Sequence, residues 1–420
     1  MEQILRSINK IAIRCLFLFF FLPVLTGCAF TGLKKDLKEQ EKLATLHGEV
    51  VAASATSAPI IIAILADDPL QPRLINYRVL TEPGEFIFIV KPEKYRVFAF
   101  EDSNRDQHFQ PGERVGKTEP IHIQQPGTDS KVTVQLPDNP DLELAKKITG
   151  LKSRVIIDLP AARMSLGRVV LLDDPAFSKS NAEMGLWQPL RSTREIPLGI
   201  FFLEDFDPEK IPVLLVHGVA GSPVHFEKLV ARMDRKKFQP WVVFYPSGFN
   251  IPLIAEYLNS LTRELHVRHG FNTMKIVAYS MGGLASRAFL NVYAESPQPF
   301  AVDCFITVST PWNGHDAANM GLKYAPAVIP VWNDIVPGSQ FLKSLFSTTL
   351  PGDIPHYLLF GFKGESALTS GNNDGTVSIA SQLRPEAQTG SIMVRGFDEN
   401  HTSILRSKEV SELINEILNR

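Results

Sequence analysis

A serine flanked by small residues follows a short apolar run in the second half of the chain. Residues 274–284 read Met-Lys-Ile-Val-Ala-Tyr-Ser-Met-Gly-Gly-Leu, with Ala278 and Gly282 on either side of Ser280. Small residues at these positions are typical of a sharp turn between a strand and a helix that presents a serine hydroxyl, although ordinary turns contain them as well. In such a turn the N–H of Met281 points toward a developing oxyanion. The pattern predicts Ser280 as a nucleophile.

An apolar run that ends in His-Gly lies upstream of this serine. Residues Ile211 to Gly218 read Ile-Pro-Val-Leu-Leu-Val-His-Gly, which suits a buried parallel strand that enters a tight loop. Alone, a segment of this kind is more often a plain strand-loop-helix unit. Together with the serine turn, it resembles the lipase and esterase branch of the α/β-hydrolases. The resemblance implies that the N–H of Val219 is the second oxyanion donor.

A serine nucleophile needs a base and a carboxylate that orients the base. In this fold they follow the serine in the order acid, then histidine. His356 to Phe362 reads as a core strand, and the polar loop after it presents Asp374. Ser391 to Phe397 reads as the last strand, and His401 lies just beyond it. We therefore expect Ser280, Asp374 and His401 to form a catalytic triad.

Each of these assignments has a competitor. Asp374 lies in Asn-Asp-Gly, a common turn sequence, and a histidine near the end of a chain is usually a solvated surface residue. The competing bases are His315 and His356, and the competing acid is Asp334, which precedes the strand whose end carries the acid in this fold.

The resemblance extends over about residues 150–420 and includes two further motifs. Ser309 to Gly314 reads Ser-Thr-Pro-Trp-Asn-Gly, and Asn373 to Val377 reads Asn-Asp-Gly-Thr-Val, both similar to segments of lipases. Tyr279 stands where many relatives carry histidine, and Ala278 replaces a glycine. We therefore expect an α/β-hydrolase fold, a mostly parallel sheet with helices on both faces, with a small β-sandwich domain before it.

The first residues resemble an export signal. Basic residues precede the apolar run Cys15 to Leu25, which is too short and too Pro-interrupted to span a bilayer. Leu25 to Cys28 reads Leu-Thr-Gly-Cys and resembles a bacterial lipobox, which implies cleavage after residue 27 and acylation of Cys28. The alternative is an uncleaved anchor helix. Ala29, rather than Asp, favours the outer membrane or cell envelope of a Gram-negative host.

Composition agrees with an exported globular enzyme. The chain is 44% hydrophobic and 21% charged, with a net charge of −2 and no basic patch, which argues against nucleic acid as a partner. Once Cys15 leaves with the signal and Cys28 carries lipid, Cys304 alone remains, so no intramolecular disulfide is expected. Stability must then come from packed cores.

A β-rich region follows a charged segment expected to act as a tether over residues 28–45. Five short runs with alternating polarity read as strands of a β-sandwich over residues 46–140: Glu49 to Ala53, Ile60 to Leu65, Glu85 to Val90, Tyr95 to Phe100 and Lys131 to Gln135. The region resembles transthyretin-like and prealbumin-like modules. Its protein partner is not evident from the sequence.

One loop of this region has the spacing of a calcium loop. Asp102, Asn104, Asp106 and Glu113 occupy positions 1, 3, 5 and 12, which are oxygen-ligand positions. Gln107 stands where such loops carry glycine, and no helices flank the segment. The alternative is a polar hairpin turn closed by Pro111 and Gly112. We expect no required cofactor for the reaction itself.

The substrate is predicted from an insertion over residues 311–355 between two core strands. It is rich in aromatic and aliphatic residues, which suits a cap that receives an acyl chain, or equally a segment that packs on the core. We expect hydrolysis of carboxylic esters with lipid-like or apolar acyl groups. An acyltransferase would use the same residues, and a tethered, non-catalytic binding scaffold is the alternative outside enzymes.

Overall fold

The computed structural model describes residues 29–67, 73–138, 156–157, 165–295, 298–351, 354–364 and 371–420. The predicted signal segment 1–27, the lipid site Cys28 and the expected boundary between the two domains near residues 140–150 lie outside the described residues. No helix within the described ranges is both long enough and apolar enough to cross a membrane.

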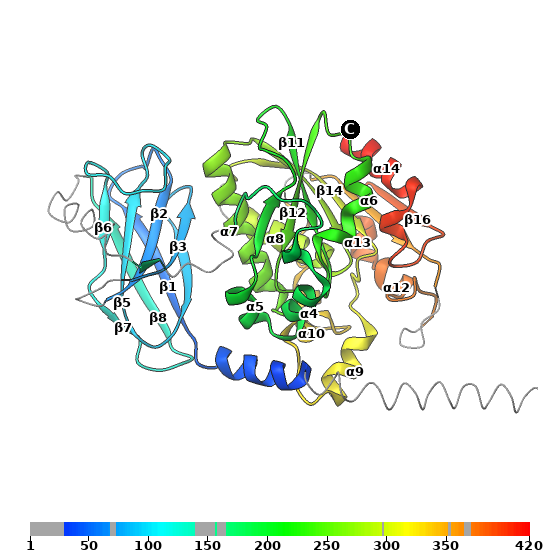
Figure 1. The fold of residues 1–420 in the computed structure, drawn as a ribbon, viewed down its shortest axis with the longest axis horizontal. Helices are drawn as coiled ribbons and strands as arrows, with labels where there is room; N and C mark the ends of the chain where they lie inside the picture. Colours follow the sequence, from blue (N-terminus) through cyan, green and yellow to red (C-terminus); the bar gives the residue numbers. More distant parts are fainter. Residues whose placement is uncertain are drawn as a thin grey trace, which may run out of the picture.

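The β-sandwich predicted before the larger domain is confirmed (Figure 1). One sheet has the order β4-β1-β8, and the other has the order β6-β5-β2-β3-β9 with β7 beside β5. Alternate residues of β4 are buried, and Phe86 and Phe88 share a core with Ile62 and Val97 of the facing sheet. The strands are β1 (Ala44–Ala52), β2 (Ile60–Ala66), β3 (Arg73–Leu80), β4 (Glu85–Val90), β5 (Lys94–Glu101), β6 (Val115–Lys117), β7 (Ile121–His122), β8 (Asp129–Leu136) and β9 (Ile156–Ile157).

Residues 29–40, which the sequence assigned to a tether, form a helix. Leu33 is fully buried in the main core of the larger domain. Both carboxylate oxygens of Asp36 accept backbone hydrogen bonds, at 2.9 Å from Leu190 and 2.8 Å from Arg191. The segment is therefore docked on the larger domain, because it buries an apolar side chain and caps a helix there.

The larger domain is built on a seven-stranded sheet with the order β10-β12-β11-β13-β14-β15-β16. β10 is antiparallel to β12, and every other pair is parallel. Leu214 and Val216 enter one apolar cluster, while Val213 and Leu215 enter a second on the other face. The strands are β10 (Gly199–Phe202), β11 (Ile211–Val216), β12 (Phe238–Phe244), β13 (Thr273–Tyr279), β14 (Ala301–Val308), β15 (His356–Gly361) and β16 (Met393–Phe397).

Helices cover both faces of this sheet, so the predicted α/β-hydrolase fold is confirmed (Figure 1). α7 and α8 bury their apolar sides in the first cluster, and α6 and α14 do so in the second. The helices are α4 (Lys179–Trp187), α5 (Pro189–Glu195), α6 (Glu227–Arg232), α7 (Ile251–His269), α8 (Met281–Ala294), α9 (Asp316–Tyr324), α10 (Pro330–Ile335), α11 (Gln340–Ser344), α12 (Ile379–Gln382), α13 (Pro385–Thr389) and α14 (Lys408–Leu418), with 3₁₀ turns η1 (Pro175–Phe177), η2 (Pro223–Phe226) and η3 (Ile404–Arg406).

The insertion 311–355 forms α9, α10 and α11, and most of its apolar residues pack on the core. Trp312, Ile329 and Val331 lie in the same cluster as α7 and α8. Met320 and Tyr324 of α9 are exceptions, with exposed fractions of 53% and 63%. Of the two interpretations that the sequence left open, core packing applies to most of the segment, and an outward apolar side is confined to α9.

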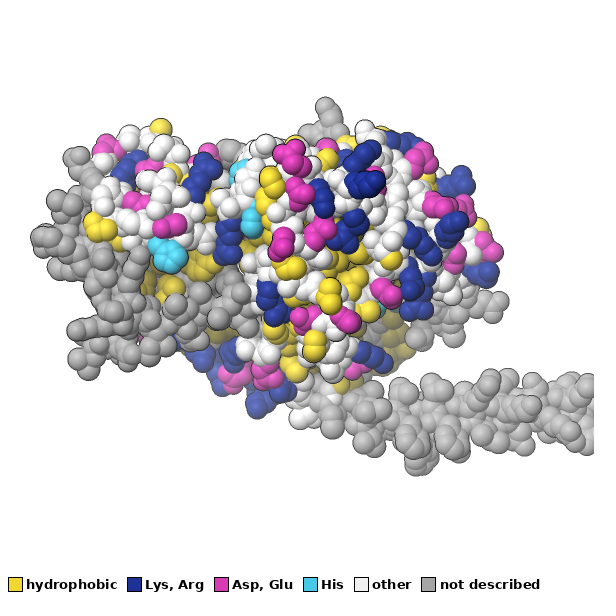
Figure 2. Space-filling model, turned by 45° about the horizontal axis from the view of Figure 1, so that its top comes forward, with side chains coloured by type: hydrophobic (Ala, Val, Ile, Leu, Met, Phe, Trp, Pro, Cys, Tyr) yellow, Lys and Arg dark blue, Asp and Glu magenta, His cyan; other side chains and the backbone are white. Residues whose placement is uncertain are grey.

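The sandwich packs against α7 of the larger domain. The Tyr77 hydroxyl donates to Glu264 Oε1 at 2.6 Å, and Arg263 donates to Thr81 at 3.3 Å. Val267 of α7 joins a cluster with residues of β2 and β3. Over the face that Figure 2 draws, side chains of both charge signs are interspersed.

Candidate active site

Ser280 stands at the tip of a strained turn between β13 and α8. Its backbone has φ 54° and ψ −133°, a conformation that an L-residue rarely adopts. The Ser280 N–H donates to Val308 O at 2.8 Å, and Gly283 N donates back to Ser280 O at 2.9 Å. The sheet and the first turn of α8 therefore hold the serine in place from both sides.

Two glycines are required for this turn to fit. A Cβ on Gly282 would lie 2.3 Å from Val216 O and 2.6 Å from His217 O, which no side chain could occupy. A Cβ on Gly218 would lie 2.8 Å from Ser280 Cβ. The loop after β11 therefore passes directly beside the serine.

The structure brings Ser280, His401 and Asp374 together in one hydrogen-bonded line. His401 Nε2 lies 3.0 Å from Ser280 Oγ, and His401 Nδ1 lies 2.7 Å from Asp374 Oδ2. The Asp374 side chain is fully buried, and that of His401 is nearly so. Asp374 follows β15 and His401 follows β16, so the ends of three parallel strands supply the three groups.

Further hydrogen bonds fix the orientation of the acid and the base. Asp374 Oδ1 accepts from the N–H of Thr376 at 3.0 Å and of Val377 at 2.7 Å, which leaves Oδ2 for the imidazole. The main-chain N–H of His401 donates to Asp374 O at 2.7 Å. The Tyr279 hydroxyl donates to His401 O at 2.6 Å. Both main-chain groups of His401 are thus held.

This arrangement determines the tautomer of His401. An ionised carboxylate only accepts hydrogen bonds, so Nδ1 carries the proton in the neutral imidazole. Nε2 then has a free lone pair and accepts from the Ser280 hydroxyl. The geometry is that of a base ready to take the serine proton.

Two backbone donors lie beside the serine without an acceptor. Neither the Val219 N–H nor the Met281 N–H has a hydrogen-bond partner within the described part of the chain. A Cβ on Gly218 would lie 3.3 Å from Met281 N, so the loop and the start of α8 are adjacent. These are the two donors that the sequence analysis assigned to an oxyanion.

His217 sets the direction of the Val219 N–H. Its Nδ1 lies 2.9 Å from Gly218 O, and Gly221 N donates to the same oxygen at 3.0 Å. Since a trans peptide points its N–H opposite to its C=O, fixing Gly218 O also fixes the Val219 N–H. Burial lowers the pKa of His217 to about 3, so the imidazole stays neutral in this role.

The competing residues bond other groups, and of them His315 lies near enough to His401 and Asp374 for their charges to act on it. Asp334 accepts the N–H of Ile251 at the start of α7, and burial raises its pKa to about 6. His356 is buried between Thr307 and Ser391, each at 2.8 Å, and burial lowers its pKa to about 3. His315 accepts from the N–H of Ala317 at the start of α9, and burial lowers its pKa.

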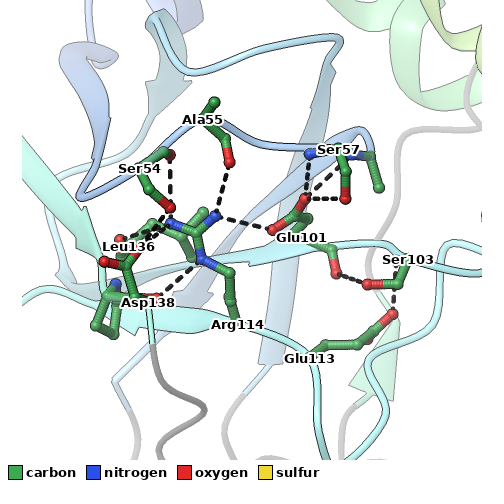
Figure 3. Close-up of polar contacts among 11 residues, drawn as sticks. Ser54, Ala55, Ser57, Glu101, Ser103, Glu113, Arg114, Leu136 and Asp138 are labelled. Atoms are coloured by element: carbon green, nitrogen blue, oxygen red, sulfur yellow. Dashed lines mark hydrogen bonds and ion pairs between the residues drawn. The ribbon is translucent and has the colours of Figure 1, made fainter.

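The acidic loop of the sandwich is a hydrogen-bonded turn, and Figure 3 shows the bond between Ser103 and Glu113 at its ends. Asp102 accepts backbone N–H bonds from Asp106 at 3.1 Å and Gln107 at 2.9 Å, and Asn104 donates to Asp106 at 3.0 Å. Glu113 accepts from the N–H of Ser103 at 2.9 Å. Within the described residues no three His, Cys, Asp or Glu side chains are grouped to hold a metal ion. The backbone hydrogen bonds to Asp102 are compatible with a polar turn, and the calcium loop stays a prediction.

Tyr279 and His217 are positioning residues that the sequence analysis did not identify as such. Tyr279 was noted as a departure from the usual histidine, but its partner, His401 O, lies 122 residues downstream. His217 was part of the strand pattern, and the residues that it contacts follow from the loop conformation. No periodicity or spacing in the sequence marks either contact.

Comparisons with known proteins found solved structures of low identity and low TM-score. No family model matches the chain, and no match is found among curated proteins. The mature lipase BlEst2 of Bacillus licheniformis is 18% identical over 52% of this chain and 97% of that chain, with a TM-score of 0.41. Lipase B of Aspergillus fumigatus is 16% identical over 56% and 57%, with a TM-score of 0.40. Phospholipase PlaB of Legionella pneumophila is 18% identical over 41% and 44%, with a TM-score of 0.34.

Proposed function

We propose that the chain is a serine hydrolase that cleaves carboxylic esters through an acyl-enzyme on Ser280. One observation carries the proposal: the continuous line from Ser280 Oγ through His401 to Asp374, with distances of 3.0 and 2.7 Å. A serine, a base and a buried carboxylate in this geometry have recognised roles in acyl transfer.

Acylation begins when Ser280 Oγ attacks the ester carbonyl carbon. His401 Nε2 takes the hydroxyl proton, and the resulting imidazolium is stabilised by Asp374 through the Nδ1 hydrogen bond. The carbonyl oxygen becomes an oxyanion and accepts hydrogen bonds from the N–H groups of Val219 and Met281, for which the described residues offer no other acceptor. When the intermediate collapses, the alcohol leaves with the proton from His401.

Deacylation repeats the same steps with water as the nucleophile. His401 Nε2 takes a proton from water, hydroxide adds to the acyl carbon, and Ser280 leaves as the protonated alcohol. The chain supplies the nucleophile, the base, the orienting acid and the oxyanion donors. Water and the ester supply the remaining atoms.

The proposed substrate has an apolar acyl group. Val219 and Val224, in and after the loop beside Ser280, expose 37% and 41% of their surface. Apolar side chains beside a site favour substrates with an apolar acyl group over substrates with a charged acyl group. The exposed Met320 and Tyr324 of α9 belong to the insertion that the sequence associated with an acyl chain.

We also propose that the enzyme is exported and tethered to the outer membrane or cell envelope of a Gram-negative bacterium. The support is the Leu25 to Cys28 motif after a basic and apolar segment. Acyl chains on Cys28 would anchor the protein through buried methylenes.

The experiment is an ester chain-length series measured on wild type and Ser280→Ala. We expect kcat/KM to rise from short to longer acyl chains, and we expect Ser280→Ala to lose turnover on every ester without a change in Tm. Turnover by Ser280→Ala within tenfold of wild type would refute the acyl-enzyme. A rate that falls steadily with chain length would refute the apolar substrate and leave the triad standing.

A further inference from the structure

The helix over residues 29–40 is rigidly attached to the larger domain. Leu33 is fully buried, and Asp36 accepts the N–H groups of Leu190 and Arg191 at the start of α5. Gly32 lies close to the Gln188 side chain, where a Cβ would be 2.8 Å from it. The helix therefore keeps a fixed orientation relative to the active site.

A chain of aromatic rings connects this helix to α9. Phe30 packs edge-on against Trp187 of α4 with centroids 5.1 Å apart, and Trp187 packs against Trp332 of α10 at 6.2 Å. Gly321 of α9 lies against Trp332, since a Cβ there would be 2.6 Å from the indole. Helix 29–40, α4, α10 and α9 thus form one packed layer.

This layer lies at the carboxyl ends of the parallel strands. Residues 245–248 follow β12, and Gly248 N donates to Gly185 O of α4 at 3.0 Å. Val331 N of α10 donates to Gly248 O at 3.2 Å. Ser280 follows β13, which is separated from β12 by β11 alone, so the carboxyl ends of the two strands lie at the same edge of the sheet. Figure 1 shows helix 29–40 and α9 together along the lower side of the larger domain.

The outer side of the layer combines exposed lysines with exposed apolar residues. Lys34, Lys35 and Lys38 are exposed, and none has an acidic partner within the described ranges. Glu39 is bonded to Lys42, and Glu41 is also exposed. On α9, Met320 and Tyr324 are exposed, and Lys323 lies over the Tyr324 ring at 5.0 Å. Lysines beside amphipathic aromatic residues are typical of a protein surface that contacts an anionic bilayer.

We propose that Lys34, Lys35, Lys38, Met320 and Tyr324 form a membrane-facing surface that lies on an anionic phospholipid bilayer. This inference rests on the proposed function, because the anchor residue Cys28 directly precedes Ala29, the first described residue of the docked helix. A single peptide unit spans about 3.8 Å, so the anchor places this end of the helix at the bilayer. The edge of the sheet that carries Ser280 then faces the bilayer, which contains lipid esters.

The test places an environment-sensitive fluorophore on the full-length, acylated protein in vesicles of phosphatidylethanolamine and phosphatidylglycerol. The label is attached through Met320→Cys, and the matched control is Lys236→Cys, an exposed position before the amino end of β12 at the opposite edge of the sheet. Cys304 is buried and does not compete for the label. We expect brominated lipids to quench the label at residue 320 and not the label at residue 236. Equal quenching, or none at residue 320, would overturn the membrane-facing surface.

The lysines are tested with charge reversal. Lys34→Glu combined with Lys38→Glu is expected to reduce both the quenching at residue 320 and the hydrolysis of a vesicle-embedded ester severalfold, since an anionic surface attracts lysine and repels glutamate. Lys228→Glu combined with Lys236→Glu, two exposed lysines of the α6 region, is expected to change neither. Equal effects of the two pairs would overturn the role of the helix.

A soluble short ester separates this inference from the proposed function. If the protein hydrolyses the soluble ester but residue 320 is not quenched, the surface is wrong and the hydrolase stands. If the soluble ester is not cleaved, the proposed function fails whatever the quenching shows. A protein that does not remain with the vesicles would overturn the anchor and the surface together.

Discussion

Replacing Asp374 by asparagine tests how His401 is held. Asp374 Oδ1 accepts two backbone N–H groups, so the oxygen of the amide would remain in that position. The amide NH₂ would then face His401 Nδ1 in place of Oδ2. Two donors cannot share a hydrogen bond, so the imidazole must move its proton to Nε2. That nitrogen would donate toward Ser280 and no longer act as a base.

The expected effect of Asp374→Asn follows from this change of tautomer. The same replacement in another serine hydrolase lowers kcat by about 10⁴, which corresponds to about 5.4 kcal/mol of transition-state stabilisation. We expect a similar loss here, with KM for a short ester within a few-fold, because the acyl pocket is unchanged.

The assay is steady-state hydrolysis of a short activated ester, with Asp334→Asn as the matched control. Asp334 is half-buried and also accepts a backbone N–H, but it belongs to α10 and bonds the start of α7. We expect its kcat to stay within a few-fold of wild type. A loss below tenfold for Asp374→Asn, or a larger loss for Asp334→Asn, would refute the assignment of the acid.

Three further predictions concern stability, positioning and processing. The folded pKa of Asp334, about 6, lies above its ordinary value, so the neutral form is favoured and stability is lost as pH rises through 6. Asp334→Asn should therefore raise Tm at pH 8 by a few degrees and leave it unchanged near pH 4. The rise corresponds to about 1–2 kcal/mol in the free energy of unfolding, after allowance for the partial exposure of Asp334. A gain in Tm of equal size at both pH values would contradict this prediction. Tyr279→Phe removes the hydrogen bond to His401 O and should lower kcat about tenfold with KM and Tm unchanged. A fall in kcat that comes with a lowered Tm would indicate a merely structural role. Cys28→Ser should block acylation and cleavage, so detergent-phase partition of an unacylated, normally processed chain would rule out the lipid anchor.

The sequence was sufficient to predict the sheet and the proximity of Ser280, Asp374 and His401, because the relevant signals are local. Ser280 is marked by the small residues beside it, and Asp374 and His401 each follow a strand whose apolar run is readable. In a parallel sheet, the carboxyl ends of such strands meet at one edge. Order along the chain therefore becomes proximity in space.

Elements whose partners are distant in sequence were not predictable in the same way. β3 was not predicted because its sequence shows no alternation of buried and exposed residues. Most of its residues are partly buried, since α7 packs against the strand. Helix 29–40 reads as a charged tether because few of its residues are apolar. The carboxylate of Asp36 accepts hydrogen bonds from the backbone N–H groups of Leu190 and Arg191, which lie 154 and 155 residues downstream. These contacts depend on the tertiary fold, and local propensity does not encode them.

The central claim is that Ser280 is the nucleophile, and active-site labelling tests it most directly. The protein is treated with a serine-directed fluorophosphonate, and the modified peptide is identified by mass spectrometry. We expect one modified serine, Ser280, and no labelling of Ser280→Ala at unchanged Tm. Efficient labelling of folded Ser280→Ala, or modification of a different serine in the wild type, would contradict the account.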